Sequence, residues 1–463
     1  MLLLPEISVF FFSVFFLFCS VSKNKNNIVS FGKLLSLLVF ALTALGIANN
    51  GELFSGAYRI DLFSQIFKVL LGLGFCLVVL MFGENKEIED TFLSEYYMFF
   101  GFSTLGLMML TSSVELISIV ISLELSSYSL YVIVPLRRAQ GQFQIEASMK
   151  YLFFGAISTG IMLFGMSYLY GMAHSTFLSD IISVFPQFLS QPIGILALVL
   201  TLTGFFFKLS LFPFHFWAPD IYEGASNSTT TFIATIPKVA ATALLIRITM
   251  LASPDSFQFV NILMVLAALS MTFGNLVGLV QKDIKRLLAY SGIAHAGYLM
   301  MGILSLSREG SASAMFYIMI YVFMTLACFY VLILLSQKGE NITLNDLAGL
   351  SRKSPLLALL LAVAAFSLAG IPPTGGFTGK FFLLTSAFRS GHLAIVIIAA
   401  VNTVISIFYY LNLVRISYSK EAVSIEPIKL SLSENFLCYL FIFLILYMGI
   451  LPFGLLELFK IAL

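Results

Sequence analysis

Apolar runs close to 20 residues long recur along the whole of this 463-residue sequence. A helix needs about 20 apolar residues to cross the hydrocarbon core of a bilayer, because each residue rises about 1.5 Å along the axis. Hydrophobic residues make up 59% of the chain and charged residues only 10%, whereas a soluble domain carries about 25% charged residues. These runs predict an all-α polytopic membrane protein. No basic patch with interleaved aromatic residues indicates nucleic-acid binding.

The runs divide into about fourteen predicted transmembrane helices, each roughly as long as a bilayer requires. They lie near residues 3–21, 32–49, 62–82, 96–112, 114–135, 147–171, 192–214, 228–250, 259–280, 287–305, 312–336, 355–388, 392–414 and 435–458. No basic segment precedes the first run, which therefore reads as a retained helix and not as a cleaved signal peptide.

Basic residues in the loops indicate the orientation of the chain. The loops after odd-numbered spans carry Lys23, Lys25, Lys33, Lys86, Arg137, Arg138, Lys282, Lys285, Arg286, Lys338, Arg352, Lys353, Arg415 and Lys420. The opposite loops carry chiefly Arg59, Arg308 and Arg389. Because basic loops stay in the cytoplasm, both termini are predicted on the outer side, as an even number of spans also requires.

Ionisable residues lie well inside several of the predicted spans. Glu124, Lys208, Lys238, Lys380 and His295 each interrupt an apolar run. A charge at the centre of a bilayer costs about 2.5–3.5 kcal/mol on insertion scales, so a set of them indicates a function. For His295 alone, a neutral, hydrogen-bonded structural role is as plausible as a role in proton transfer.

Other charged residues have simpler explanations. Lys68, Lys150 and Arg247 lie nearer to helix ends, where long side chains extend to the lipid headgroups or form packing ion pairs. Glu146 and Lys150 are one helical turn apart and are expected to pair with each other. His215 is a functional candidate because it adjoins a helix break.

Two predicted spans are broken by residues that do not suit a helix. Pro213 interrupts the seventh span, and the twelfth span contains Pro372, Pro373, Gly375 and Gly376 just before Lys380. Proline removes a backbone donor and clashes with the preceding turn, so each helix should open there. Open backbone at membrane depth is tolerated only inside protein or beside water. A kink that serves packing alone is the alternative, but it leaves the adjacent lysines unexplained.

These features together suit proton transfer. Burial favours the neutral form of a lysine or a carboxyl, and a nearby opposite charge favours the ionised form, so a buried Glu–Lys pair can act as a switch. The segment EASMKYLFFGAIS at 146–158 also resembles SASAMFYIMIYVF at 311–323, five spans later. We therefore expect two inverted five-helix repeats, 95–251 and 259–415, between N-terminal helices in 1–94 and a last helix in 416–463.

Four long motifs resemble one family. FKLSLFPFHFWAPDIYEGA at 207–225, IPKVA at 236–240, NLVGLVQKDIKRLLAYSGIAHAGYLMMG at 275–302 and SLAGIPPTGGFTGKF at 367–381 are similar to antiporter-like subunits of respiratory complex I. The resemblance covers roughly residues 60–460 and is best for the N-type subunits of bacterial NADH–quinone oxidoreductase. A lysine in the twelfth span, SLELSSYSLY around Glu124 and the short C-terminus favour that type over the L and M types.

The resemblance implies proton pumping in a bacterial inner membrane. Glu124 matches the fifth-span glutamate, Lys208 its partner lysine, Lys238 the central lysine, Lys380 the twelfth-span lysine, and His295 a connecting polar position. The redox chemistry, with FMN, iron–sulfur clusters and quinone, would lie in other subunits, which would be the partners of this chain. No cofactor or metal is expected in this chain.

Three alternatives remain open on the sequence alone. A subunit of a multi-subunit cation/proton antiporter, or of a related membrane hydrogenase or donor-linked dehydrogenase, would keep the proton channel and change the driving reaction. A structural membrane scaffold would carry the same charges without transferring protons through them.

Overall fold

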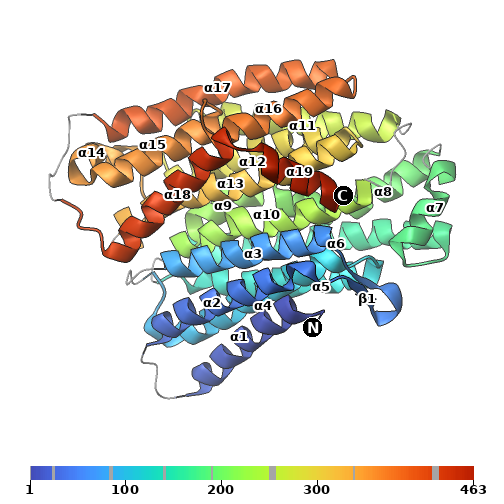
Figure 1. The fold of residues 1–463 in the computed structure, drawn as a ribbon, viewed down its shortest axis with the longest axis horizontal. Helices are drawn as coiled ribbons and strands as arrows, with labels where there is room; N and C mark the ends of the chain where they lie inside the picture. The colour runs from blue at the N-terminus through green and yellow to red at the C-terminus, as the bar shows by residue number, and fades with distance from the viewer. Residues whose placement is uncertain are drawn as a thin grey trace. The chain divides into compact units, whose positions relative to one another are not determined.

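A computed structural model gives the fold, and it describes residues 2–22, 27–82, 87–138, 142–188, 191–249, 257–336, 339–419 and 427–463. Most of these residues are helical (Figure 1). The loop residues Lys23, Lys25, Lys86, Lys338 and Lys420, used above for orientation, lie outside the described ranges. The chain forms two compact units. Unit 1 contains Met1–Leu209, Gly224–Ile262 and Ala462, and unit 2 contains Ser210–Glu223, Leu263–Ile461 and Leu463.

The fourteen predicted runs all correspond to helices. Twelve helices are long and apolar enough to cross a membrane, by length and composition, among the residues described. The two remaining runs are α4, which falls outside that set, and the twelfth run, which is split into α15 and α16. The prediction of an all-helical polytopic membrane protein is confirmed.

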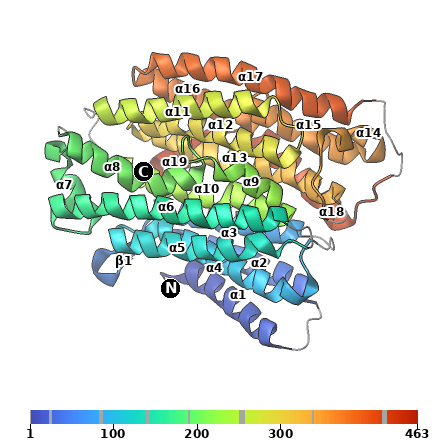
Figure 2. The same cartoon turned by 180° about the vertical axis from the view of Figure 1, so that it is seen from behind.

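Unit 1 holds nine α-helices and a short hairpin among the residues described. They are α1 (Leu4–Val21), α2 (Ile28–Leu45), β1 (Gly51–Leu53), β2 (Tyr58–Ile60), α3 (Leu62–Met81), α4 (Leu93–Ser112), α5 (Leu116–Ile133), α6 (Gln142–Ala173), α7 (Leu178–Phe188), α8 (Pro192–Leu209) and α10 (Asn227–Thr249). Helix α10 packs against α3, α4 and α8, and it is buried nearly all around. Figure 2 shows α5 beside α6 from behind.

Close backbone approach joins the helices of unit 1. A Cβ added to Gly106 of α4 would lie 2.6 Å from the Ser122 carbonyl oxygen of α5. A Cβ on Gly165 of α6 would lie 2.4 Å from the backbone nitrogen of Thr201 on α8. Since small residues let membrane helices approach closely, these glycines fix how α4 meets α5 and how α6 meets α8.

Unit 2 is built around one long buried helix, α13 (Arg308–Leu335), which packs against α12, α15, α16 and α18. Its other elements are α9 (Trp217–Gly224), α11 (Phe257–Gly278, which begins in unit 1), α12 (Ile284–Leu304), α14 (Leu350–Lys353), α15 (Pro355–Ala369), α16 (Gly375–Arg389), α17 (Leu393–Ser417), α18 (Leu432–Ile450) and α19 (Phe453–Ala462).

Both predicted helix breaks are present. Helix α8 ends at Leu209, and the next helix, α9, starts only at Trp217. Helix α15 ends at Ala369, where Gly370 adopts a φ of +87° that L-residues avoid, and α16 starts at Gly375. The expected division into five-helix repeats at 95–251 and 259–415 stays a prediction. The hairpin β1–β2 and helix α7 were not predicted.

Candidate functional site

Glu124 and Lys208, the carboxylate and amine expected to act together, lie on different helices of unit 1. Glu124 is half-buried on α5, and its Oε1 accepts a hydrogen bond from Thr159 Oγ1 of α6 at 2.6 Å. Lys208 is 3% exposed in the last turn of α8. Its Nζ lies 5.9 Å from the ring centre of Tyr151, also on α6. Helix α6 therefore contributes a contact to each of the two charges.

The two charges interact without touching. Electrostatic attraction from Glu124 acts on Lys208. In the part of the chain that the structure describes, Thr159 is the hydrogen-bond partner of Glu124, and Lys208 Nζ has no hydrogen-bond partner. Because a buried ammonium needs compensation, the charge on Lys208 depends on the carboxylate and on the aromatic ring beside it. A change in the charge of Glu124 therefore changes the electrostatic stabilisation of the Lys208 ammonium.

Lys238 lies in the middle of α10 and is 2% exposed. Pro237 precedes it and has no N–H, so the helix lacks the donor that would bond the Ile233 carbonyl. Thr242 Oγ1 donates to the Lys238 carbonyl at 2.7 Å. The amine thus stands on a buried helix whose hydrogen-bond ladder is interrupted beside it.

Buried hydroxyl groups line α10 between its start and Lys238. They belong to Ser228, Thr229, Thr230, Thr231 and Thr235. Tyr96 Oη of α4 lies 3.2 Å from Thr229 Oγ1, and Thr235 Oγ1 donates to the Thr231 carbonyl at 2.7 Å. Hydroxyls both donate and accept, so such a row can hold water or pass a proton in either direction.

A carboxylate that sequence reasoning missed lies at the start of this row. Glu87 is 2% exposed, and its Oε2 accepts hydrogen bonds from Ser228 N at 3.1 Å and Ser228 Oγ at 3.0 Å. Its Oε1 has no hydrogen-bond partner among the residues described. A carboxylate is stabilised at a helix N-terminus by the free N–H groups there. Nothing in the sequence pointed to this contact, because Glu87 lies among the polar residues between two predicted spans.

In unit 2, His295 of α12 is held between two tyrosines. Its Nδ1 lies 2.6 Å from Tyr317 Oη of α13, and its Nε2 lies 3.1 Å from Tyr410 Oη of α17. Tyr410 Oη also contacts Ser291 Oγ, one turn before the histidine. Both ring nitrogens are therefore in a hydrogen-bonded chain that joins three helices, and the tautomer sets which nitrogen donates.

Lys380 fills the break between α15 and α16. Its Nζ donates to the carbonyls of Leu368 at 2.9 Å and Ala369 at 3.1 Å. In a continuous helix these two carbonyls would accept from residues 372 and 373, which are prolines without an N–H. The same Nζ lies 4.6 Å from the ring centre of Tyr298 on α12. The break therefore supplies the oxygen atoms that hold this amine.

Glycines make room for that arrangement. A Cβ on Gly376 would lie 1.8 Å from the Ser367 carbonyl oxygen, and one on Gly370 would lie 3.0 Å from Lys380 Cδ. The Gly376 N–H donates to Ser367 Oγ at 3.0 Å, which ties the start of α16 back to α15. Only residues without a side chain fit these two positions.

His215 lies in the break between α8 and α9, within unit 2. It is 1% exposed and stacks on Phe212, with ring centroids 5.3 Å apart, and meets Phe273 edge-on at 4.7 Å. The following helix α9 is fixed by Arg286 of α12, whose Nη1 lies 2.8 Å from Asp220 Oδ1 and 2.7 Å from Glu223 Oε2. A half-buried ion-pair cluster therefore holds the helix that follows the break.

The predicted residues fall into two groups. Unit 1 holds Glu124, Lys208 and Lys238, and unit 2 holds His215, His295 and Lys380. Of the simpler cases, Lys150 pairs with Glu146 at 2.7 Å, as predicted. Lys68 and Arg247 do not extend to the surface but form ion pairs inside unit 1, which are described below. No group of three or more metal-ligating side chains occurs among the described residues.

Comparison with known proteins identifies the family of this chain. The family described as "NADH:quinone oxidoreductase/Mrp antiporter, TM" matches residues 113–406. NADH-quinone oxidoreductase subunit N 2 of Opitutus terrae is 44% identical over 440 residues, 93% of this chain and 91% of the relative. A subunit N 2 of Solidesulfovibrio magneticus is 44% identical over 420 residues, 91% and 89% of the two chains. A chain of respiratory complex I from Thermus thermophilus superposes with a TM-score of 0.83, at 31% identity and 98% coverage of both chains.

The helical membrane fold, its two broken helices and its buried lysines define an antiporter-like membrane subunit. The chain belongs to the subunit N family of NADH-quinone oxidoreductase, the proton-translocating respiratory complex I, and acts in it with other subunits. It is a multi-pass membrane protein of the bacterial complex.

Proposed function

We propose that this chain moves protons through Glu124, Lys208, Lys238, His295 and Lys380, with His215 at the first helix break. The redox reaction of the other subunits, which hold FMN, iron–sulfur clusters and quinone, supplies the driving force. Partners include related antiporter-like subunits and the bilayer of the bacterial inner membrane. The loop charges favour both termini on the outer side.

The observation that carries this proposal is the setting of the three lysines. Lys208, Lys238 and Lys380 are between 2% and 4% exposed, each inside a helix whose neighbouring residues are also largely buried. Packing alone would be served as well by apolar residues, since removing a charge from water is costly even where the charge has a partner. Amines that lose and regain a proton explain why lysine stands at all three positions.

Glu87 and the hydroxyls of α10 suit the entry of protons. Glu87 binds Ser228 at the start of α10, and the hydroxyls that follow along the helix toward Lys238 can each accept and donate. The loop charges favour the cytoplasmic side for this end of α10. Glu87 would then take up a proton and pass it toward Lys238.

The test is proton pumping by the assembled complex in proteoliposomes. Lys238→Ala and Glu124→Ala should each cut NADH-driven proton uptake several-fold while the complex still assembles. Lys150→Ala is the matched control, because it removes a lysine from the exposed Glu146 pair. Normal pumping in either of the first two variants would contradict the proposal.

A further inference from the structure

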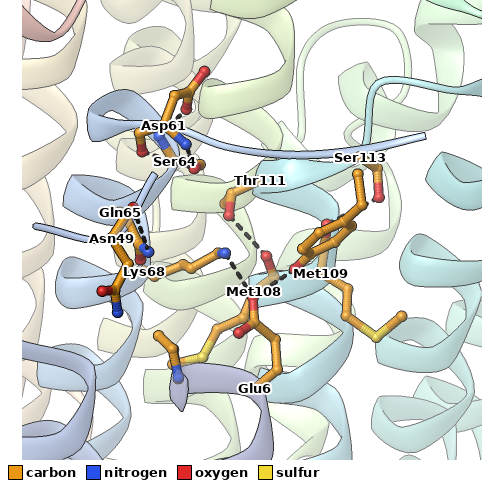
Figure 3. A network of polar contacts seen from close by, with 12 residues as sticks. Glu6, Asn49, Asp61, Ser64, Gln65, Lys68, Met108, Met109, Thr111 and Ser113 are labelled. Carbon is orange, nitrogen blue, oxygen red and sulfur yellow. Dashed lines mark hydrogen bonds and ion pairs between the residues drawn. The ribbon is translucent and has the colours of Figure 1, made fainter. Parts of the chain in front are cut away.

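A buried ion pair lies in unit 1, away from the residues of the proposed proton path. Lys68 Nζ of α3 is 2.6 Å from Glu6 Oε1 of α1, and the Lys68 side chain is fully buried. Figure 3 shows the two side chains pointing toward one another. Tyr58 Oη donates to the same Glu6 oxygen at 2.5 Å, and its ring faces Lys68 Nζ at 5.1 Å.

The second oxygen of Glu6 distinguishes this pair from a packing contact. Both partners of Glu6 bind Oε1, and Oε2 is buried with no hydrogen-bond partner in the described part of the chain. A carboxylate that serves only to fix helices would be expected to use both oxygens, because each unsatisfied buried acceptor is costly. The bare Oε2 is a place where a proton can bind.

A second ion pair continues from the first toward solvent. Arg247, near the end of α10, donates through Nη1 and Nη2 to the two carboxylate oxygens of Asp61, each at 3.0 Å. Asp61 caps α3, is about a quarter exposed, and also has Arg59 at 3.7 Å. Asp61 and Arg247 both act electrostatically on Lys68. Glu6, Tyr58, Lys68 and this pair thus form one charged cluster that reaches the surface.

The cluster lies at the opposite end of α10 from Glu87. Arg247 follows Lys238 by nine residues, or about 14 Å along the helix axis. Helix α3, which carries Lys68, packs directly against α10. The loop charges assign this end to the outer side of the membrane.

We propose that Glu6 and Lys68 form a proton-exchanging pair that serves as an outlet for protons from unit 1. A proton that binds Oε2 converts the Glu6 carboxylate to the neutral acid, so Lys68 loses its counter-charge. Lys68 then releases one proton toward Asp61 and becomes a neutral amine. Transfer of the carboxyl proton to that amine restores the ion pair, so one proton enters and one leaves in each cycle. This inference rests on the proposed function of Lys238.

Lys68→Arg is the sharpest test. Arginine keeps the charge and the pairing with Glu6 but does not give up its proton in proteins. A pair that only holds helices together would tolerate this change, whereas a proton outlet would be blocked. We expect an assembled complex with normal NADH oxidation in uncoupler, whose protons moved per NADH fall to the ratio of the Lys238→Ala complex.

A double replacement, Glu6→Gln with Lys68→Met, gives an independent measurement. It removes both charges, so no buried charge is left alone, and neutral replacement of a buried pair is often tolerated for stability. If the pair is a proton outlet, this complex should assemble, and its protons moved per NADH should be as low as in the Lys68→Arg complex. The matched control is Glu146→Gln with Lys150→Met, which removes the exposed pair.

The outcomes separate this inference from the proposed function. Wild-type pumping in Lys68→Arg or in the double variant, together with a defect in Lys238→Ala, would leave the relay intact and overturn the outlet. Normal pumping in Lys238→Ala would overturn the proposed function itself. Failure of Lys68→Arg to assemble would mark the pair as a packing contact and would also overturn the outlet.

Discussion

Lys380 donates to the carbonyl of Leu368, an oxygen that a continuous helix would have bonded to the residue at position 372. That residue is a proline, and the next one, Pro373, leaves the Ala369 carbonyl free in the same way. The helix break and the lysine therefore form one structural unit. Two prolines expose two oxygens, and the amine that follows them binds both.

Restoring the backbone donors should compete with this binding. Pro372→Ala with Pro373→Ala returns two N–H groups to the segment, so the carbonyls of Leu368 and Ala369 can bond within the helix. We expect an assembled complex that pumps several-fold less than wild type. The measurement is NADH-driven proton uptake in proteoliposomes, with Pro355→Ala, at the first turn of α15, as the control. Full pumping by the double variant would show that the exposed carbonyls are not needed.

His295 should depend on both of its tyrosines. Tyr317→Phe removes the group 2.6 Å from Nδ1, and Tyr410→Phe removes the group 3.1 Å from Nε2, while both keep the ring. If protons pass through the imidazole, each variant slows pumping about 10-fold or less, and the double variant matches His295→Ala. Equal pumping in all three variants and wild type would assign the histidine a structural role.

Glu87 should matter more than its neighbour Glu89, which is exposed. Glu87→Gln keeps a hydrogen-bonding side chain beside Ser228 but cannot take up a proton at neutral pH. We expect a loss of stability of about 1 kcal/mol from the weakened cap and a clear fall in the initial rate of proton uptake. Glu89→Gln is the control for both measurements. An unchanged rate of proton uptake in Glu87→Gln would show that protons do not enter through Glu87.

The Asp61–Arg247 pair predicts a pH-dependent contribution to stability. Burial alone would raise the pKa of the Asp61 carboxyl, but the Arg247 guanidinium and the Ser64 N–H hold it below its usual range. A lowered pKa stabilises the fold above the carboxyl's unfolded pKa of about 3.9, and this stabilisation is lost as the pH falls through the folded value. The melting temperature of wild type should therefore exceed that of Asp61→Asn at pH 6, and the gap should close below about pH 4. A difference in melting temperature that does not change with pH would mean that the charge of Asp61 does not stabilise the fold.

The sequence predicted most of the helices, because apolar length and proline chemistry act locally. Both breaks followed from Pro213 and Pro372–Pro373 alone. The partners of His295 could not be predicted, since Tyr317 and Tyr410 come from helices that only the fold brings together. For Lys68 the sequence left open whether the side chain extends to the headgroups or forms an ion pair, and nothing in it identified Glu6, 62 positions earlier, as the partner.

The most direct test of the account is the water structure around the buried lysines in a high-resolution cryo-EM map of the complex that contains this chain. Mutants can fail for several reasons, but a proton path needs a continuous row of water or polar side chains. We predict ordered water bound to Nζ of Lys208 and Lys238, and water beside Lys380 and His295. Apolar side chains packed around these amines, with no density for water, would contradict the claim that protons move through them.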